Sequence, residues 1–306
     1  CFNIESLAEL EFINNVAESI SEIAPVAVRI NPNVDAQTHK YISTGKAENK
    51  FGIDYEETMK VYERASALPH IQIKGIQMHI GSQLTNVSPF VEAVKRVIPL
   101  VKELQQTYGI EFFSIGGGIG IVYEEALASG PSNWWSEQEN PPLSPDVYAR
   151  ELLPLLRDLK LKIVLEPGRY MSGNAGVLLT SCLYEKKGRD KTFKIVDAGM
   201  NDLIRPALYE GHHEIVPIVE RQSENTVIGD VVGPICESGD FFCQNRAIAD
   251  FQQGDLIALM SAGAYSFTMA SNYNSRPLPA EILVDGTETS VARKRQQWSD
   301  LIAGEL

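Results

Sequence analysis

Short apolar runs alternate with longer amphipathic stretches over the first 173 residues. Five apolar runs have the length and composition of strands: CFNI (1–4), VAVRIN (26–31), IKGIQMHI (73–80), FFSIGGG (112–118) and KIVLEPG (162–168). Four intervening segments carry apolar residues at helical spacing, and several begin at a Ser or Asp cap: 6–20, 55–68, 88–109 and 144–159. This order predicts a parallel sheet with helices outside it. The sheet could be open and doubly wound, or it could belong to a (β/α)8 barrel, of whose eight units the sequence shows five.

The pattern changes after residue 173 to β-rich runs separated by Gly, Asn and Pro turns. Six of these runs are predicted as strands: 176–187, 192–199, 213–221, 225–233, 255–263 and 281–286. The change predicts two domains, a βα domain over 1–173 and a mostly antiparallel, β-rich domain over 174–306. Within the first domain, SGPSNWWSEQENPPLSP (129–145) is predicted as a long loop.

Composition places the chain among globular proteins and argues against several partners. Its 306 residues, 44% of them hydrophobic, suffice for the core of one large or two ordinary domains. No apolar run approaches the ~18–20 residues of a membrane-spanning helix and no signal-peptide pattern is present, so we expect no membrane partner and a cytoplasmic location. A net charge of −13, from 27 Lys+Arg and 40 Asp+Glu, argues against nucleic acid as a partner.

The four cysteines, Cys1, Cys182, Cys236 and Cys243, are too few and too unevenly spaced for a disulfide framework. We therefore expect reduced thiols. The sequence begins with Cys1 in place of Met, and its apolar start runs directly into a helical pattern. This start suggests a chain that begins inside a domain.

Three predicted strands end in segments that could carry chemistry: HIGSQ (79–83), GGGIG (116–120) and EPGR (166–169). The glycine run fails the dinucleotide fingerprint, because GxGxxG from Gly116 would need Gly where Ile121 stands, and it lacks the GK[ST] of a P-loop. Its backbone N–H groups could hold a phosphate, or the run could be a tight turn without a ligand.

His79 and Glu166 each have a structural and a functional interpretation. Apolar flanks favour a buried core histidine at position 79, whereas its place at a strand end, just before Gly81 and Ser82, suits a ring that stacks on a planar ligand. Glu166 could form an ion pair with Arg169 across a solvated turn. A carboxylate at the end of a buried strand needs a partner, and a protonated ring nitrogen would serve.

The second domain adds an arginine and two tyrosines as candidates. Arg205, in NDLIRPALYE (201–210), precedes a proline among hydrophobic residues, which suits a fixed guanidinium aimed at a carboxylate. Tyr209 lies four residues later, and Tyr265 lies in a turn of small residues. All three could instead serve solubility on surface loops.

The segment PICESGDFFC (234–243) could be a metal site, a nucleophile or an ordinary sheet edge. Its candidate metal ligands are Cys236, Glu237, Asp240 and Cys243. Their spacing is unlike that of ordinary zinc sites, so no metal is predicted. No histidine base stands next to a cysteine, which disfavours a nucleophile. Cys243 follows two phenylalanines and is expected to be a buried thiol.

Six motifs, in this order, resemble the fold-type III pyridoxal-phosphate-dependent decarboxylases, and within them the branch that acts on diaminopimelate: HIGSQ, GGGIG, EPGR, RPALYE, CESGD and GAYSFTMASNYNSRP. The resemblance covers nearly the whole chain, including YISTGKAENKFGI (41–53). It implies a pyridoxal phosphate (PLP) cofactor bound at the mouth of an alanine-racemase-like (β/α)8 barrel, followed by a β-rich domain. It also implies that the first strands of the barrel are missing from the sequence.

The resemblance implies a role for each matching residue. His79 would stack on the pyridine ring, and Glu166 would keep the pyridine nitrogen protonated. The phosphate would be held by Ser82, Gly117, Gly118, the backbone of Glu166, Pro167, Gly168 and Arg169, and the Tyr265 hydroxyl. The substrate's distal carboxylate would be bound by Arg169, Arg205 and Tyr209, and its ammonium by Glu237, with Tyr265 also facing the substrate. This mixture of charges suits the zwitterionic end of diaminopimelate better than the plain amine of ornithine.

Cys236 matches the cysteine that the family uses to protonate Cα after carbon dioxide leaves. Family members are homodimers in which this loop reaches the partner's active site, so Cys236 and Glu237 would serve the neighbouring chain. The family's cofactor-linking lysine is expected upstream, since Lys46, Lys50 and Lys74 do not match its motif, and the chain by itself is then expected to be inactive. Two alternatives stay open: a related decarboxylase for arginine, ornithine or carboxynorspermidine, and a non-catalytic homologue.

Overall fold

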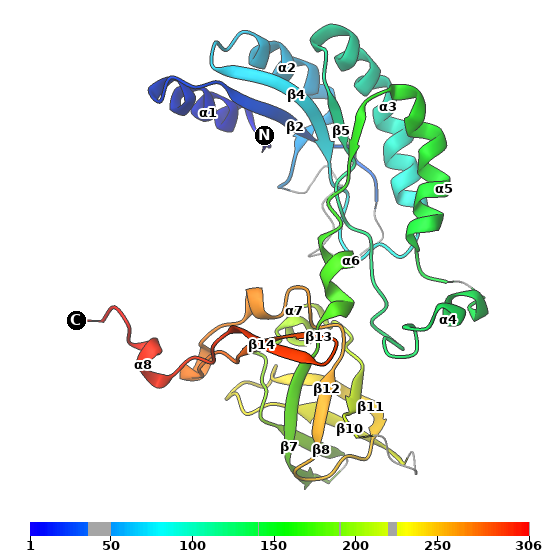
Figure 1. The fold of residues 1–306 in the computed structure, drawn as a ribbon, viewed down its shortest axis with the longest axis vertical. Coiled ribbons are helices and arrows are strands. Elements are labelled where there is room, and N and C mark those ends of the chain that lie inside the picture. The colour runs from blue at the N-terminus through cyan, green and yellow to red at the C-terminus, as the bar shows by residue number, and fades with distance from the viewer. Residues whose placement is uncertain (36–49, 140, 190, 220–224, 306) are drawn as a thin grey trace. The chain divides into compact units, whose positions relative to one another are not determined.

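The computed structural model describes residues 1–35, 50–139, 141–189, 191–219 and 225–305, which form two compact units (Figure 1). The first unit comprises Cys1–Ile121 and Gln138–Tyr170, and the second comprises Val122–Glu137 and Met171–Leu306. Most of the 41–53 motif, with Lys46, lies outside the described residues. The division into domains 1–173 and 174–306 stays a prediction.

A parallel sheet forms the centre of the first unit, in the order β1-β2-β4-β5-β6, with the short β3 paired to β2. Its strands are β1 (Phe2–Ile4), β2 (Ala24–Asn31), β3 (Ile53–Asp54), β4 (Ile71–Met78), β5 (Phe112–Ser114) and β6 (Lys162–Val164). Since all neighbouring strands pair in parallel, their carboxyl ends lie at one edge of the sheet. The parallel sheet predicted from the apolar runs is confirmed.

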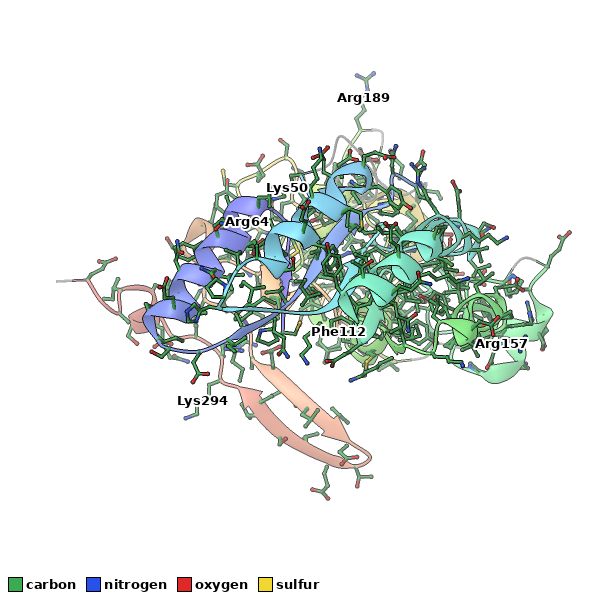
Figure 2. All side chains as sticks on the ribbon, turned by 90° about the horizontal axis from the view of Figure 1, so that it is seen from above. Lys50, Arg64, Phe112, Arg157, Arg189 and Lys294 are labelled. Carbon is green, nitrogen blue, oxygen red and sulfur yellow. The ribbon has the colours of Figure 1, made fainter. Side chains whose placement is uncertain are left out.

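The helices of the first unit follow the four predicted segments: α1 (Leu7–Ser19), α2 (Thr58–Ser66), α3 (Ser88–Tyr108) and α5 (Pro145–Leu156). Short 3-10 turns lie beside two of them: η1 (Tyr55–Glu57) and η2 (Arg157–Leu159). Ser6 caps α1 by accepting a hydrogen bond from the Glu9 N–H. Gly109 ends α3 in the left-handed conformation, at φ 65°. Arg64 on α2, labelled in Figure 2, forms an ion pair with Glu11 on α1.

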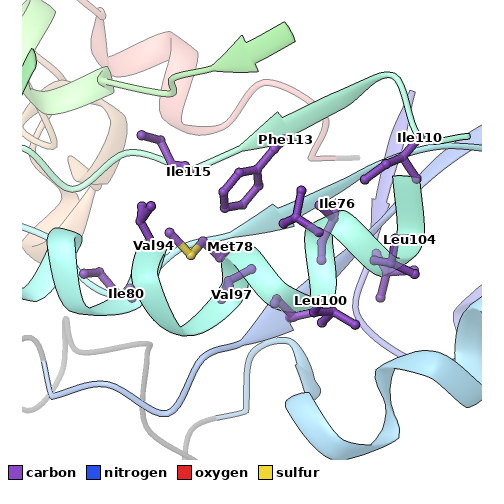
Figure 3. Close-up of a cluster of buried hydrophobic side chains, with 14 of the residues drawn as sticks. Ile76, Met78, Ile80, Val94, Val97, Leu100, Leu104, Ile110, Phe113 and Ile115 are labelled. Atoms are coloured by element: carbon purple, nitrogen blue, oxygen red, sulfur yellow. The ribbon is translucent and has the colours of Figure 1, made fainter. Parts of the chain in front are cut away.

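Apolar side chains of α3 pack against β4 and β5 in a dense cluster (Figure 3). Its members include Ile76, Met78, Ile80, Val94, Val97, Leu100, Leu104, Ile110, Phe113 and Ile115. All of them are at most 5% exposed. Full burial of one such side chain stabilises the fold by about 1.5–3 kcal/mol. The cluster therefore fixes β4 and β5, and with them the segments that follow their carboxyl ends.

The second unit contains a six-stranded sheet in the order β11-β10-β8-β7-β12-β9, and a separate hairpin of β13 and β14. The strands are β7 (Leu178–Lys187), β8 (Thr192–Val196), β9 (Ile215–Pro217), β10 (Thr226–Val232), β11 (Phe241–Ala249), β12 (Leu256–Leu259), β13 (Glu281–Asp285) and β14 (Glu288–Arg293). Its pairings are antiparallel except that of β10 with β8, as the predicted mostly antiparallel domain requires.

Short helices complete the chain: α4 (Ser132–Glu137), α6 (Gly168–Ser172), α7 (Arg205–Tyr209) and α8 (Trp298–Leu301). Three 3-10 turns accompany them: η3 (Gly173–Ala175), η4 (Phe267–Met269) and η5 (Tyr273–Ser275). In the part of the chain that the structure describes, no helix is long and apolar enough to cross a membrane.

Among the described residues, strand β11 is the longest element that the hydrophobic pattern missed. Gln244, Asn245 and Arg246 interrupt its apolar run, and Asn245 has a left-handed φ of 48°. Polar residues are tolerated there because β11 ends the sheet, with β10 as its neighbour on the path. The last three residues of PICESGDFFC, 241–243, are therefore strand, and the seven before them form a loop.

Other predicted boundaries were wrong in length. The run 112–118 leaves the strand conformation after Ser114, because Gly116 and Gly118 have φ of 72° and 98°. The predicted loop 129–145 contains α4, and within residues 213–219 of the predicted strand 213–221 the structure has only β9. Neither α7 nor β14 was predicted, since each is too short or too polar for a clear period.

Candidate active site

The segments that follow β4, β5 and β6 lie together because these strands are neighbours in the sheet. His79 comes directly after β4, and Glu166 comes two residues after the last residue of β6. The glycine run begins two residues after β5. The positions predicted at three strand ends are thus brought to one edge of the first unit.

Three glycines allow these segments to approach one another more closely than any side chain permits. A Cβ on Gly116 would lie 2.3 Å from the Met78 carbonyl oxygen, and one on Gly117 would lie 2.1 Å from the Glu166 carbonyl oxygen. A Cβ on Gly118 would lie 2.2 Å from the Gly81 carbonyl oxygen. The run is therefore a packed cradle of backbone between two neighbouring strand ends, which a turn without tertiary contacts would not need.

His79 is held as a neutral ring at this edge. The Gly117 N–H donates to its Nδ1 over 3.2 Å, so Nδ1 accepts and the proton of the neutral ring is on Nε2. Burial lowers the pKa of His79, and the positive charge of Arg29 lowers it further, against the opposing effect of Glu166. A neutral, partly buried imidazole can stack on an electron-poor aromatic ring without adding charge.

Glu166 is exposed, yet its carboxylate is anchored from the inside of the sheet. Its Oε1 accepts a hydrogen bond from the Ser114 hydroxyl at 2.6 Å. The Gln77 Nε2 lies 3.4 and 3.3 Å from Oε1 and Oε2. Ser114 and Gln77 are 1% and 3% exposed, so the sheet itself fixes the carboxylate. An oriented carboxylate of this kind can pair with a protonated nitrogen that arrives from outside.

The EPGR segment also reaches the end of β4. Arg169 is 7% exposed, and its Nη2 donates to the Ser82 hydroxyl at 3.0 Å. Between the two charged residues, Pro167 and Gly168 form a turn in which the Gly168 N–H donates to the Glu166 carbonyl at 2.9 Å. Glu166 and Arg169 thus form hydrogen bonds with different partners, Ser114 and Ser82.

These residues fit PLP, whose ring is planar and whose two ends carry a basic nitrogen and a phosphate. The neutral His79 ring suits the face of the ligand, and the Glu166 carboxylate suits the nitrogen. Because residues 116–118 of the run carry no side chains, backbone N–H groups are what this segment can offer to a phosphate.

In the second unit, Arg205 begins α7 and Tyr209 ends it. Arg205 is 6% exposed. Its guanidinium lies over the Tyr123 ring, 4.1 Å from the ring centre, and its Nη1 lies 2.7 Å from His213 Nε2. The sequence predicted a fixed guanidinium at Arg205, and the structure supplies the two aromatic rings that fix it.

The CESGD loop is exposed at its tip and anchored at its base. Cys236 and Glu237 are exposed. The Cys236 N–H donates to Asn274 Oδ1 at 3.2 Å, and the Tyr273 hydroxyl donates to Glu237 Oε2 at 3.2 Å. The hydrogen bond to Glu237 raises the pKa of Tyr273. Residues 273 and 274 of the motif GAYSFTMASNYNSRP (263–277) thus hold the loop by two contacts.

Asp240 provides the base of the same loop. It is 4% exposed and accepts 2.6 Å hydrogen bonds from the N–H groups of Ile235 and Met200. Burial raises the pKa of this carboxyl. Sequence reasoning placed Asp240 only in a candidate zinc set, and Asn274 and Tyr273 were missed, because their contacts join segments far apart in the chain.

Zinc chemistry gains no support from the described residues, in which no group of three or more His, Cys, Asp or Glu could hold a metal ion. Cys243 lies in β11 and is 6% exposed, so the expected buried thiol is confirmed. Burial raises the pKa of its thiol. Tyr265, by contrast, is 43% exposed and adopts a left-handed φ of 59° in its turn of small residues.

Comparison with known proteins agrees with this geometry. The family described as "Pyridoxal-dependent decarboxylase, pyridoxal binding domain" matches residues 1–173. Diaminopimelate decarboxylase of Aquifex aeolicus is 44% identical over 306 residues, which is 100% of this chain and 70% of that protein. The enzyme of the same name from Pseudomonas aeruginosa is 47% identical over 306 residues, with the same two shares.

Solved structures show the same similarity in three dimensions. Helicobacter pylori diaminopimelate decarboxylase complexed with L-lysine superposes with a TM-score of 0.88 at 40% identity, covering 98% of this chain and 72% of that one. Diaminopimelate decarboxylase from M. jannaschii, in co-complex with L-lysine, gives a TM-score of 0.87 at 35% identity, covering 100% of this chain and 69% of that one. The predicted fold class, PLP-binding barrel strands followed by a β-rich domain, is confirmed. This chain belongs to the diaminopimelate decarboxylases, within the pyridoxal-dependent decarboxylase family.

Proposed function

We propose that this protein catalyses the PLP-dependent decarboxylation of meso-2,6-diaminopimelate to L-lysine and carbon dioxide, the last step of lysine biosynthesis. The observation that carries the proposal is the Glu166 carboxylate, anchored by Ser114 and Gln77 beside the glycine cradle. The relatives named above support the choice of reaction. Arg205 and Glu237, of opposite charge, support a zwitterionic substrate end.

The cofactor-binding residues would orient PLP by three kinds of contact. His79 would stack on the ring, Glu166 would hold a proton on the pyridine nitrogen, and Tyr265 would donate its hydroxyl to the phosphate. Ser82 and the backbone of 117–118 and 166–169 would hold the remaining phosphate oxygens. When bound, PLP supplies an electron sink for the electron pair that remains when carbon dioxide leaves.

The substrate-binding residues would fix the end of diaminopimelate that does not react. Arg205, Arg169 and Tyr209 would bind the distal carboxylate, since a guanidinium on a fixed stem offers paired N–H donors to a carboxylate. Glu237 would accept from the distal ammonium, with Tyr265 nearby. Ornithine has no carboxylate at this end, so it could not form these contacts.

Cys236 would deliver the proton that Cα requires after decarboxylation. Its exposed position at the tip of an anchored loop supports a role in the active site of another chain. We propose a homodimer in which Cys236 and Glu237 act in the partner's active site. We also propose that the protein is cytoplasmic. Its cofactor-linking lysine would lie outside these 306 residues, which would therefore not catalyse the reaction by themselves.

The test is a comparison of kcat/KM on the full-length, PLP-loaded protein for meso-diaminopimelate, ornithine, arginine and carboxynorspermidine. We expect diaminopimelate to be preferred by at least about 100-fold, the discrimination that a lost carboxylate–arginine contact produces. A preference for ornithine, arginine or carboxynorspermidine would support the related decarboxylase. Firm PLP binding with no turnover of any of them would support the non-catalytic homologue.

A further inference from the structure

His213 is a fully buried histidine, 0% exposed, that no predicted role includes. Both of its ring nitrogens are engaged. Its Nδ1 lies 2.7 Å from the Met260 carbonyl oxygen, and its Nε2 lies 2.7 Å from Arg205 Nη1. A carbonyl oxygen can only accept and a guanidinium can only donate, so His213 is the neutral tautomer with its proton on Nδ1. Its Nε2 lone pair therefore receives an N–H of Arg205.

The surroundings keep His213 in this neutral form. Burial is the largest cause that lowers its pKa, and the nearby charges of Arg205 and Arg246 act in the same direction, to a pKa of about 3. A charged imidazolium would present a second N–H to the guanidinium and repel it. At neutral pH, His213 is therefore a permanent hydrogen-bond acceptor for Arg205.

Two further contacts limit where the Arg205 guanidinium can go. Tyr123 lies under its plane and packs edge-on against His213, with ring centres 5.3 Å apart. On another side, a Cβ on Gly211 would lie 3.2 Å from Arg205 Nη2, so a side chain there would press on the guanidinium. Ring, imidazole and glycine together define one orientation for a side chain with four rotatable bonds.

We propose that His213 is a positioning residue that orients the Arg205 guanidinium toward the distal carboxylate of the substrate. The inference rests on the proposed function, which assigns that carboxylate to Arg205. His213 touches neither substrate nor cofactor, and it acts by accepting a hydrogen bond from Nη1 and donating one to Met260. Ligands without the distal carboxylate do not depend on it.

The test uses equilibrium binding, measured by the absorbance of PLP in the full-length holoenzyme. The two ligands compared are L-lysine and cadaverine. Lysine is diaminopimelate without the carboxylate that reacts, so it keeps the distal carboxylate, whereas cadaverine has the same carbon chain and no carboxylate. In His213→Asn the shorter amide can still reach Met260 but cannot reach Arg205. In His213→Gln the amide oxygen can occupy the place of Nε2. His212→Asn, at a neighbouring histidine that contacts Arg246, is the matched control.

We expect His213→Asn to weaken L-lysine binding about tenfold, the effect of a misplaced charged hydrogen bond, and to change cadaverine binding less than about twofold. His213→Gln should restore most of the loss, and His212→Asn should behave as the wild type. Gly211→Ala, which crowds the guanidinium without changing His213, should show the same selective loss of lysine.

Three results would overturn the proposal. Equal weakening of lysine and cadaverine in His213→Asn would show a merely structural histidine. An unchanged lysine affinity in both His213→Asn and Gly211→Ala would show that Arg205 needs no such support. If the wild-type protein binds cadaverine and lysine with equal affinity, Arg205 does not bind the distal carboxylate. That result would contradict the proposed function as well.

Discussion

The two units hold their candidate residues in different ways. In the first unit, Gly116, Gly117 and Glu166 follow directly from strands whose side chains form the core, and the sheet fixes them. In the second unit, Cys236 and Glu237 lie on an exposed loop that is anchored at its base. A cofactor that stays bound needs a rigid cradle, whereas a proton donor must reach a reacting carbon.

The two groups of residues also differ in whether their hydrogen-bond partners lie within their own unit. The strand-end group has its hydrogen-bond partners within the sheet edge, as Ser114 and Gln77 show for Glu166. The loop group has partners for its backbone and for Glu237, while Cys236 itself is exposed. We infer that the first group is preformed and that the second completes a site elsewhere. Four changes test the contrast.

Gly118→Ala is expected to have the largest effect. The new Cβ would lie 2.2 Å from the Gly81 carbonyl oxygen, at a φ of 98° that L side chains rarely adopt. The strand ends must separate, so PLP affinity should fall by more than about 1,000-fold, or about 4 kcal/mol. Equilibrium dialysis of PLP measures the loss. Gly130→Ala, whose Cβ would meet only the Leu127 carbonyl at 3.4 Å, should bind PLP normally. Retention of affinity in Gly118→Ala would show that the cradle is not a binding surface.

Cys236→Ala should lower kcat by about 100- to 1,000-fold, the usual contribution of a general acid, with little change in KM. Steady-state kinetics on diaminopimelate separate the two constants. Cys243→Ala is the matched control, because this thiol is buried in β11. It should lower the free energy of unfolding by about 1–2 kcal/mol and leave kcat unchanged. Equal kinetic losses in both variants would contradict a special role for the loop cysteine.

Ser114→Ala should have an intermediate effect, confined to the first unit. It removes the 2.6 Å hydrogen bond to Glu166, so the carboxylate is free to turn away from the pyridine nitrogen. Loss of a hydrogen bond to a charged group predicts about tenfold weaker PLP binding. Ser136→Ala, which loses only a hydrogen bond to the Asn133 carbonyl on exposed α4, should be silent. Normal PLP affinity in Ser114→Ala would mean that Glu166 needs no anchor.

The smallest expected effect is the loss of unfolding free energy that protonation of His213 causes when the pH falls. The folded pKa of His213, about 3, lies below its ordinary value, so the unfolded chain binds the proton more readily. The resulting stability is complete above the unfolded pKa and is lost as pH falls toward 3. Tyr123, Arg205, Arg246, His212 and the Met260 carbonyl face the ring.

Between pH 6.5 and 5.5 the wild type should therefore lose about 1 kcal/mol more unfolding free energy than His213→Gln, in which this group cannot titrate. Urea unfolding at the two pH values provides the measurement. Parallel losses in the two proteins would mean that His213 is not buried in its neutral form.

The sequence predicted the strand-end group well, because apolar runs and the residues after them are local features. His79, Glu166 and the glycine run all came from such runs. Local patterns could not reveal that Asn274 and Tyr273 anchor Cys236 and Glu237, or that His213 meets Arg205, because these contacts depend on the packing of separate segments. Strand β11 was missed for a related reason, since its position at the sheet edge allows the polar residues that hide its pattern.

A mixing experiment tests the central claim most directly. The claim is that the cradle is preformed in each chain and that the Cys236 loop completes the active site of the other chain. Glu166→Gln and Cys236→Ala would be co-expressed as full-length chains with different tags, and the mixed dimers purified with PLP. If Cys236 acts in the partner's site, each mixed dimer has one site with both defects and one site with none, and recovers about half of the wild-type activity per dimer. If Cys236 acts in its own chain, every site carries one defect. Activity no higher than that of the two parent variants would then contradict shared active sites.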